Sequence, residues 1–446
     1  MTLADRITDK SAAIGIVGLG YVGLPLAVNL ARAGYHVTGI DISHDKVAAI
    51  NRGESYIQDV APATVSEQVQ AGRLRAMPGY ERAGDLDAIF ICVPTPYNQS
   101  KAPDISYIQS AAHSIAAHLR RGQLIVLQST TYPGTTEEDV LPILEASGLK
   151  AGTDFHLAFS PERVDPGNRT YNVENTPKVV GGLTPECAEL TRLLLSSLSA
   201  PVYVVSSPRV AEMTKLLENT FRAVNIAMVN ELALLCERMG IDLWEVIQAA
   251  SSKPYGFMPF TPGPGPGGHC IPVDPHYLAW KARQYDFSSR FIELAAAVNE
   301  AMPYHVVSLV ANALNSQGKA LKGAKVLVLG VAFKKNIDDA RESPARRVIE
   351  GLLKEGADVI YNDPHVPRFS IGGDPLFPEK RILASHDMDA SMVAAQDCLV
   401  ILAAHSVYDY AWMVRTARLI VDAVDGTRGV DGRAAKVVRL GAPGQA

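Results

Sequence analysis

Short apolar runs alternate with stretches of helical spacing along the first two hundred residues. The runs lie at 13–17, His36–Ile40, Ala88–Val93, Leu124–Gln128, Phe155–Phe159 and Val202–Val205. This alternation is typical of a parallel sheet covered by helices, which binds ligands at the carboxyl ends of its strands. The pattern therefore predicts an α/β domain over residues 1–206.

A long helix is expected next. Ser207-Pro208 is a favourable helix start, and Gly240 is a favourable stop. Between them one apolar stripe recurs at spacings of three and four: Val210, Met213, Leu217, Phe221, Val224, Met228, Leu232 and Leu235. A shorter helix is expected at 242–250, and helical spacing resumes from Tyr277 to about Ala313. A helix as long as the first one commonly links domains and packs against a second subunit, so 207–314 is predicted to be a central helical region.

The α/β alternation restarts in the last third of the chain. A buried strand is expected at Ala324–Gly330, then a helix through Val348–Leu353 and a strand at Val359–Tyr361. This region, 315–446, lacks a Gly-x-Gly-x-x-Gly pattern, so a second dinucleotide site is not expected. The predicted fold is α/β, with two Rossmann-like doubly wound domains joined by a long central helix.

Composition narrows the class of protein. The chain has 446 residues, 47% hydrophobic and 20% charged, with a net charge of -5. These values are ordinary for a globular protein and give no sign of a nucleic-acid partner. The five cysteines are scattered and odd in number, no apolar run approaches membrane-spanning length, and the N-terminus does not resemble a signal peptide. We therefore expect a cytoplasmic protein without a membrane partner.

The first strand runs into a glycine-rich turn. We expect Gly18 to make the tight turn, Gly20 to admit a pyrophosphate and Gly23 to let the helix pack closely on the strand. Asp41 ends the next strand, where a carboxylate accepts from ribose hydroxyls and repels a 2′-phosphate. NAD is therefore the predicted cofactor. The same site is assigned three further side chains: Tyr21, Val22 and Lys46.

Three later strand ends carry polar residues: Val93–Pro96, Ser129–Gly134 and Ser160–Gly167. Hydroxyls and carboxylates there could touch the nicotinamide half of the cofactor and the substrate, with Thr95 and Thr130 as candidates. They could equally be turn and cap residues.

Two further groups of residues are candidates for binding. Lys215 and Asn219 are four apart on the long helix and share a face, which could present an ammonium and an amide to one substrate oxygen. A solvated lysine is the alternative. The basic groups of the loop 333–344 could clamp a phosphate or a base, or could form surface ion pairs.

A loop rich in glycine and proline, 263–275, contains Cys270. A thiol among glycines, with Asp274 four residues on, is a candidate nucleophile. A small buried hydrophobe is the plainer interpretation. A metal site from His269, Cys270, Asp274 and His276 is also conceivable, but the spacing matches none of the usual zinc frameworks.

Together these motifs resemble the UDP-sugar 6-dehydrogenases over nearly the whole chain. The motifs are Gly18–Pro25, Val93–Pro96, Ser129–Gly134, Ser160–Arg163, Glu212–Thr220, Gly267–Pro275, Phe333–Lys334 and Arg341–Ser343. The resemblance implies that the first domain binds NAD, that the last binds the uridine diphosphate, and that the long helix forms a homodimer core.

The resemblance also implies a reaction, the four-electron oxidation of a sugar C6 hydroxyl to a carboxylate. Cys270 captures the aldehyde as a thiohemiacetal, which is oxidised to a thioester and hydrolysed. Lys215 and Asn219 would stabilise oxygen charge. The other implied roles are Asp274 near the cysteine, Glu162 activating water, Thr130 holding a water, Lys334 on the sugar nucleotide and Arg341 on the cofactor side. The remaining substrate-binding assignments are Arg163, Phe257 and Gly267. Many UDP-glucose enzymes carry a second glutamate where this chain has Pro166, and Asp165 is left without a role.

The substrate is the most open point. The stretch 253–263 looks most like the subgroup acting on UDP-N-acetylglucosamine, which makes polysaccharide precursors; UDP-glucose, UDP-N-acetylgalactosamine and UDP-N-acetylmannosamine remain open. A two-electron dehydrogenase of the hydroxyacid type is a more distant alternative and has no need for Cys270. An NAD-binding redox sensor or metal module, with Cys270 as a switch, is the rival from another class.

Overall fold

The computed structural model describes residues 1–446 except 58–59, 99–100, 165–169, 269 and 444–446. It divides into two compact units. Unit 1 consists of residues 1–218 and 276–288, and unit 2 consists of 219–275 and 289–446. The three-part division expected at 206/207 and 314/315 stays a prediction. Among the described residues, no helix is both long and apolar enough to cross a membrane.

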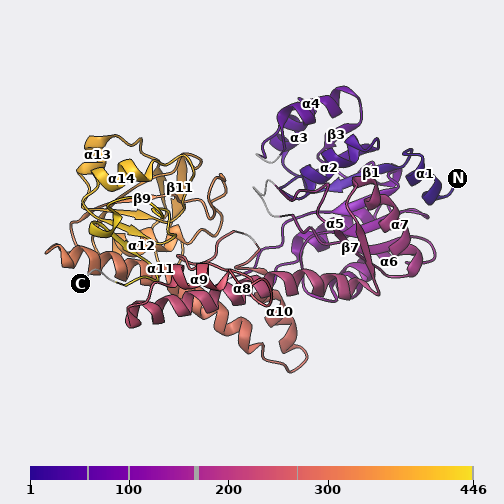
Figure 1. The fold of residues 1–446 in the computed structure, drawn as a ribbon. Coiled ribbons are helices and arrows are strands. Elements are labelled where there is room, and N and C mark those ends of the chain that lie inside the picture. Colours follow the sequence, from indigo (N-terminus) through magenta and orange to yellow (C-terminus); the bar gives the residue numbers. More distant parts are fainter. Residues whose placement is uncertain (58–59, 99–100, 165–169, 269, 444–446) are drawn as a thin grey trace. The chain divides into compact units, whose positions relative to one another are not determined.

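Unit 1 is built on an eight-stranded sheet (Figure 1). In spatial order the strands are β3 (Leu74–Met77), β2 (His36–Ile40), β1 (Ala13–Val17), β4 (Ala88–Ile91), β5 (Leu124–Leu127), β6 (His156–Phe159), β7 (Lys178–Gly182) and β8 (Val202–Val205). All neighbours are parallel except β6 and β7, which are antiparallel. The sequence predicted the parallel sheet but neither β3 nor the reversed β7.

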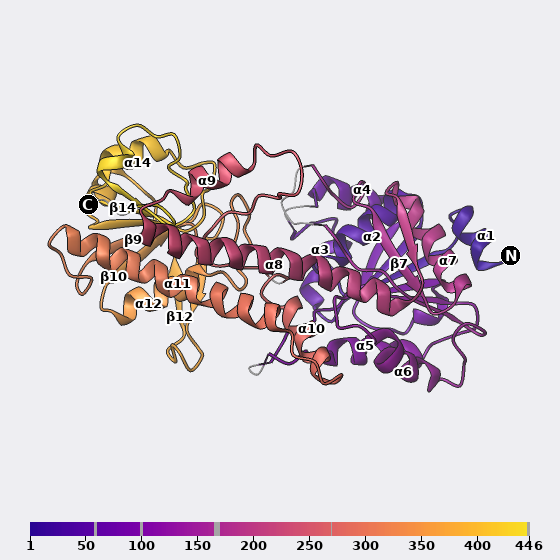
Figure 2. The same cartoon turned by 60° about the horizontal axis from the view of Figure 1, so that its bottom comes forward.

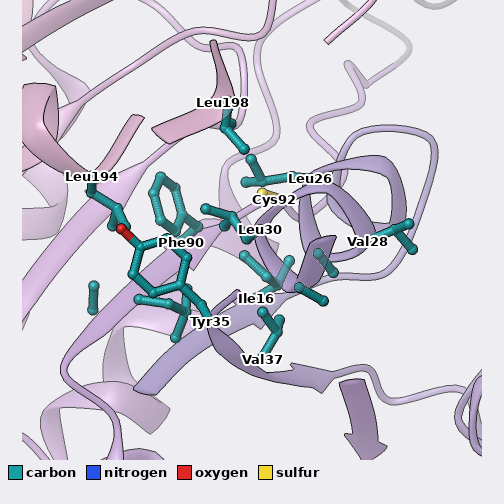
Figure 3. Close-up of a cluster of buried hydrophobic side chains, with 14 of the residues drawn as sticks. Ile16, Leu26, Val28, Leu30, Tyr35, Val37, Phe90, Cys92, Leu194 and Leu198 are labelled. Carbon is teal, nitrogen blue, oxygen red and sulfur yellow. The ribbon is translucent and has the colours of Figure 1, made fainter. Parts of the chain in front are cut away.

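Helices cover both faces of this sheet because its strands bury alternate residues on opposite sides. Ile16 and Phe90 pack with Leu30 of α2 (Figure 3), whereas Val17 and Ile89 belong to the cluster on the other face. The helices of unit 1, with its short 3₁₀ and π turns, are α1 (Leu3–Thr8), α2 (Gly23–Arg32), α3 (His44–Asn51), α4 (Pro62–Gln70), η1 (Ala83–Asp85), α5 (Ser106–Ala116), η2 (Thr135–Val140), α6 (Leu141–Glu145), α7 (Pro185–Leu195) and η3 (Ser196–Leu198). The unit is doubly wound, as predicted.

The long helix α8 runs from Pro208 to Met239, and Gly240 follows it in a left-handed conformation with φ 71°. Both predicted ends are confirmed. Several residues of the predicted apolar stripe are exposed in this chain: Leu217, Phe221 and Met228 are 59%, 47% and 48% exposed. In unit 2, α8 lies beside α11 (Figure 2), where Asn230 donates to Asn299 at 3.0 Å.

Three more helices belong to the predicted central region: α9 (Leu243–Ala250), α10 (Asp274–Arg283) and α11 (Arg290–Ser316). Asp242 caps α9 by accepting from the Trp244 N–H at 3.0 Å. The prediction that helical spacing runs from 277 to about 313 is wrong in one segment, because the chain leaves the helix and turns between α10 and α11. Asp286 adopts φ 54° there, and the Phe287 N–H donates back to the Ala282 carbonyl at 3.1 Å.

Unit 2 holds a second parallel sheet of five strands, in the order β10 (Asp358–Asn362), β9 (Lys325–Leu329), β13 (Cys398–Ile401), β14 (Ile420–Asp422) and β15 (Val437–Arg439). The remaining elements are α12 (Ala345–Lys354), β11 (Arg368–Ile371) paired with β12 (Arg381–Ala384), α13 (Ala390–Ala394), α14 (Tyr410–Thr416) and η4 (Arg433–Ala435). The second α/β fold is therefore confirmed.

Candidate active site

The glycine-rich turn after β1 gives each glycine a separate steric environment. Gly18 has φ 89°, and a Cβ there would lie 2.6 Å from the Cys92 carbonyl oxygen. A Cβ at Gly23, the first residue of α2, would lie 1.8 Å from the Gly18 oxygen, whereas one at Gly20 would meet nothing within 4 Å. Gly18 and Gly23 thus close the turn, and Gly20 leaves open space before a helix start that no side chain caps.

Asp41 stands directly after β2 and is 8% exposed. Its Oδ2 accepts from the Leu19 N–H at 2.8 Å and pairs with the Lys46 ammonium at 3.3 Å, and its Oδ1 accepts from the Ser43 N–H at 2.9 Å. Tyr56, which the sequence did not single out, donates to the Leu19 carbonyl at 2.6 Å. The carboxylate is thus fixed beside the glycine-rich turn.

The turn and the carboxylate fit the NAD expected from the sequence. The open face at Gly20 suits a pyrophosphate, and Asp41 suits ribose hydroxyls. Tyr21 is 40% exposed and Val22 is half-buried beside the same turn.

The ends of β4 and β5 are joined to one another. The Ser129 hydroxyl donates to the Val93 carbonyl at 2.8 Å, and Thr130 next to it is half-buried. Thr95 is buried, and its carbonyl accepts from the hydroxyl of Tyr277 in α10. Tyr277 is fully buried and was missed, because an aromatic residue at helical spacing is usually a core residue.

Glu212 of α8 is also buried and holds the turn that follows Thr130. Its carboxylate accepts from the Gly134 N–H at 2.6 Å and from the N–H and hydroxyl of Thr136 at 2.9 and 2.7 Å. Burial raises the pKa of Glu212 above its ordinary value, although these hydrogen bonds oppose that shift. Since Glu212 is three residues before Lys215, it fixes the Thr130 turn against the part of α8 that carries the lysine.

Glu162 lies just beyond β6 with its side chain 11% exposed. It accepts from the Lys178 ammonium at 3.0 Å, from Gln128 Nε2 at 3.2 Å and from two backbone N–H groups. Burial raises the pKa of Glu162, but Lys178 and the backbone donors outweigh it, so that the pKa lies below its ordinary value. Arg163 pairs with Glu218 at 2.6 Å, and Asp165 lies outside the described residues.

Lys215 and Asn219 are 8% and 7% exposed, so the alternative of a solvated lysine does not hold. Asn219 Nδ2 donates to Asp274 Oδ2 at 2.5 Å, which leaves a second N–H on the amide. The Asp274 backbone N–H donates to the Cys270 carbonyl at 2.9 Å. In unit 2, Asp274 thus contacts both Asn219, through its side chain, and the Cys270 carbonyl, through its backbone N–H.

Cys270 is exposed, whereas Cys92, Cys187, Cys236 and Cys398 are buried. The interpretation of Cys270 as a small core hydrophobe is therefore wrong. Among the described residues, no three His, Cys, Asp or Glu side chains are grouped to hold a metal ion. His269, one of the four possible ligands, lies outside those residues.

The loop 333–344 packs against the cysteine loop. The Gly268 N–H donates to the Arg341 carbonyl at 3.0 Å, and a Cβ at Gly267 would lie 2.6 Å from the Phe333 Cβ. The Arg341 guanidinium pairs with the buried carboxylate of Asp339 at 2.6 Å, while Lys334 is half-buried. Phe257 is 39% exposed on the stretch before the cysteine.

The assigned residues are divided between the two units. Unit 1 contains Gly18, Gly20, Tyr21, Val22, Gly23, Asp41, Lys46, Thr95, Thr130, Glu162, Arg163 and Lys215. Unit 2 contains Asn219, Phe257, Gly267, Cys270, Asp274, Lys334 and Arg341. Their individual roles stay predictions.

Comparison with known families gives one consistent result. Three domain profiles of the UDP-glucose/GDP-mannose dehydrogenase family match in order: the NAD binding domain over residues 12–199, the central domain over 209–301 and the UDP binding domain over 327–430.

Individual relatives agree on the family and differ in their sugars. The chain is 38% identical over 359 residues to a UDP-N-acetyl-D-glucosamine 6-dehydrogenase of Pseudomonas aeruginosa, covering 80% of this chain and 84% of the relative. It is 37% identical over 407 residues to a UDP-N-acetyl-D-mannosamine dehydrogenase of Salmonella typhi, covering 88% and 93%. The solved UDP-D-ManNAc dehydrogenase of Pyrococcus horikoshii matches with a TM-score of 0.86 and 31% identity, over 96% of this chain and 99% of that one.

Proposed function

Because this chain belongs to the UDP-glucose/GDP-mannose dehydrogenase family and is an NAD-dependent UDP-sugar dehydrogenase, we propose that it oxidises the sugar C6 hydroxyl by four electrons to a uronic acid through a covalent bond to Cys270. The observation that carries the proposal is that the Cys270 thiol is exposed. The Cys270 carbonyl accepts a hydrogen bond from the Asp274 N–H, and the Asp274 carboxylate accepts one from Asn219. A two-electron dehydrogenase does not require such a thiol.

NAD would be held at the glycine-rich turn and would supply the hydride acceptor, with two NAD molecules used in turn for the two hydrides. Loss of the first hydride and of the hydroxyl proton turns the C6 alcohol into an aldehyde. Lys215 and Asn219 stabilise negative charge on the C6 oxygen, since one offers an ammonium and the other a remaining amide N–H. The Cys270 thiolate attacks the C6 aldehyde, and the resulting thiohemiacetal loses a second hydride to give a thioester. Water then releases the uronate, with Glu162 facing that water and Asp274 keeping the cysteine loop in place.

The proposed substrate is UDP-N-acetylglucosamine, and the proposed product is a precursor of polysaccharide. The relative from Pseudomonas aeruginosa and the stretch 253–263 support this choice. The mannosamine and galactosaminuronic relatives are about equally similar, at 37% and 39% identity against 38%. A panel of UDP-N-acetylglucosamine, UDP-N-acetylmannosamine, UDP-N-acetylgalactosamine and UDP-glucose, assayed for NADH release, decides among them by kcat/KM. A preference for any of the last three would replace the first.

We also propose that two copies associate through α8. The helix carries an exposed apolar stripe whose residues are between 47% and 59% exposed: Leu217, Phe221, Met228 and Leu235. Leaving such a surface in water is unfavourable. The proposed homodimer covers this stripe. Met228→Lys combined with Leu235→Lys should yield monomers in sedimentation velocity, with Arg238→Glu on the same helix as a control that stays dimeric. A monomeric wild-type protein would refute the proposal.

Cys270→Ala tests the covalent route. We expect loss of uronate formation by at least 10³-fold, on the scale of a removed nucleophile, with NAD binding unchanged because the glycine-rich turn is untouched. The control is Cys236→Ala, which removes a buried thiol from unit 2 and should leave the reaction intact. Uronate formation by Cys270→Ala at a rate near that of the wild type would exclude the cysteine from the mechanism.

A further inference from the structure

Lys178 reaches the ligand edge of the unit 1 sheet because β7 runs against its neighbour. Ala158 faces Gly182 and Phe159 faces Gly181 in this antiparallel pair. The same register, continued beyond the paired residues, sets Lys178 opposite Glu162. The first residue of β7 therefore lies where the parallel strands end, and an all-parallel sheet would have placed it at the far edge.

Lys178 lies behind Glu162 as seen from solvent. The Lys178 side chain is 1% exposed and that of Glu162 is 11% exposed. The ammonium contacts both carboxylate oxygens, at 3.2 and 3.0 Å. Burying an ammonium costs free energy unless an opposite charge pairs with it. The Lys178 ammonium and the Glu162 carboxylate therefore stabilise one another.

The other donors around the carboxylate fix its orientation. The Arg163 and Val164 N–H groups donate to Oε1 at 2.7 and 2.9 Å, and Gln128 Nε2 donates to Oε2 at 3.2 Å. The Cys92 thiol is linked to the same cluster: it donates to Gln128 Oε1 at 3.6 Å, and its pKa is raised by burial and by Glu162. The Arg163 guanidinium is directed to Glu218 instead. Within the part of the chain that the structure describes, Lys178 is thus the cation that contacts Glu162.

We propose that Lys178 is a positioning residue for the hydrolytic half of the reaction: it keeps the Glu162 carboxylate ionised and fixed at the sheet edge, so that this carboxylate orients the attacking water. The proposal rests on the proposed function, because it takes Glu162 as the group that activates this water. Lys178 itself is too deeply buried to contact water or substrate and acts through Glu162.

The hydrolytic step is balanced in atoms and electrons. The water oxygen forms a bond to C6 of the thioester, the C–S bond breaks, and its electron pair leaves with Cys270 Sγ. One water proton passes to Glu162 and on to solvent, and the other is lost when the uronic acid ionises. Both hydride transfers precede this step and do not need Lys178.

Lys178→Met, which keeps the length of the side chain and removes its charge, tests the proposal. In rapid mixing it should still release a burst of two NADH per Cys270. Its steady-state turnover should fall at least tenfold, and intact mass should show the acyl-enzyme accumulating. Loss of the cation leaves Glu162 buried without its partner, which raises its pKa. The acid limb of the pH profile should therefore move to higher pH, and Lys178→Arg should restore turnover and profile.

The matched control is Lys281→Met. Lys281 is a buried cation of the same unit, with its side chain 7% exposed and paired with Glu138, and its loss should leave the burst and the pH profile unchanged. A second comparison uses the double variant Lys178→Met/Glu162→Gln. Its turnover should differ less than twofold from that of Glu162→Gln alone, because the side chain through which Lys178 acts is already neutral.

Unchanged turnover and pH profile in Lys178→Met would overturn the proposal. So would a loss of the burst equal to the loss of turnover, or additive effects in the double variant. If instead the wild-type protein fails to give two NADH per uronate with every UDP-sugar tested, the proposed function fails rather than the role of Lys178.

Discussion

The two parallel sheets begin with the same turn and use it differently. In unit 1 the turn after β1 contains Gly18 at φ 89°, and in unit 2 the turn after β9 contains Gly330 at φ 80°. A Cβ at Gly18 would lie 2.6 Å from the Cys92 carbonyl oxygen, and a Cβ at Gly330 would lie 2.6 Å from the Ala403 carbonyl oxygen. The tight turn is therefore a property of the α/β fold and not by itself a mark of nucleotide binding.

The aspartate after the second strand is shared as well. Asp41 accepts from the Leu19 N–H at 2.8 Å, and Asp363 accepts from the Val331 N–H at 2.7 Å. Asp41 remains 8% exposed beside Lys46, whereas the Asp363 side chain is fully buried and paired with His405 at 3.1 Å. Only the first carboxylate is left accessible to a ribose.

The segment after the turn differs most between the two units. In unit 1, α2 begins at Gly23, so that its N-terminus stands next to the turn. In unit 2 the loop 333–344 intervenes before α12 begins at Ala345, and the Asn336 N–H in that loop donates to His405 Nδ1 at 2.8 Å. We therefore expect the second and third glycines and the less buried carboxylate to form the dinucleotide site in unit 1, whereas in unit 2 the corresponding segment is a loop.

Gly23→Val should have the largest effect on this comparison. Its Cβ would overlap the Gly18 oxygen at 1.8 Å, so the turn must open or α2 must shift. We expect NAD affinity to fall at least 100-fold, or about 2.7 kcal/mol, in calorimetric titration. NAD affinity within threefold of the wild type would contradict the role given to this glycine.

Gly20→Val is the sharper companion, because a Cβ at Gly20 would meet no protein atom within 4 Å. The thermal midpoint should stay within about 2 °C, in keeping with a surface substitution, while NAD affinity falls about tenfold, or about 1.4 kcal/mol. A destabilised protein with normal NAD affinity would show that this glycine serves folding alone.

Gly330→Ala makes the corresponding change in unit 2. The positive φ and the overlap with Ala403 should lower the free energy of unfolding by about 2–4 kcal/mol. NAD affinity should be unchanged, because no dinucleotide site is expected in this unit. Urea denaturation checks the first expectation and titration the second, and weaker NAD binding would break the distinction between the two turns.

Asp363→Asn should lower the free energy of unfolding at pH 7 by about 1–2 kcal/mol, less than Gly330→Ala in the same unit. Burial raises the pKa of Asp363, but His405 and the backbone N–H groups outweigh it and hold the pKa below its ordinary value of 3.8. A depressed pKa contributes stability that is present above about pH 4 and is lost as pH falls through the native value. The difference in free energy of unfolding between variant and wild type, measured by urea titration, should therefore become smaller below about pH 4. A difference that does not change with pH would refute the ionic role of Asp363.

Much of the fold could be predicted from the sequence, because strand–turn–helix patterns are local. Glycine positions, the ends of α8 and the carboxylate after β2 all depend on near neighbours in the chain. The direction of β7 does not, and so Lys178 was missed although its partner Glu162 was found. Hydrophobic spacing likewise predicted the stripe on α8 but could not tell a core-facing stripe from an exposed one.

The most direct test of the proposed reaction is the ratio of NADH formed to UDP-sugar consumed, with the product identified by mass. Capture of the aldehyde by Cys270 requires two hydride transfers before release, so we expect two NADH for each uronate. A ratio of one, with an aldehyde or ketone as product, would contradict the four-electron mechanism and would leave Cys270 without a catalytic role.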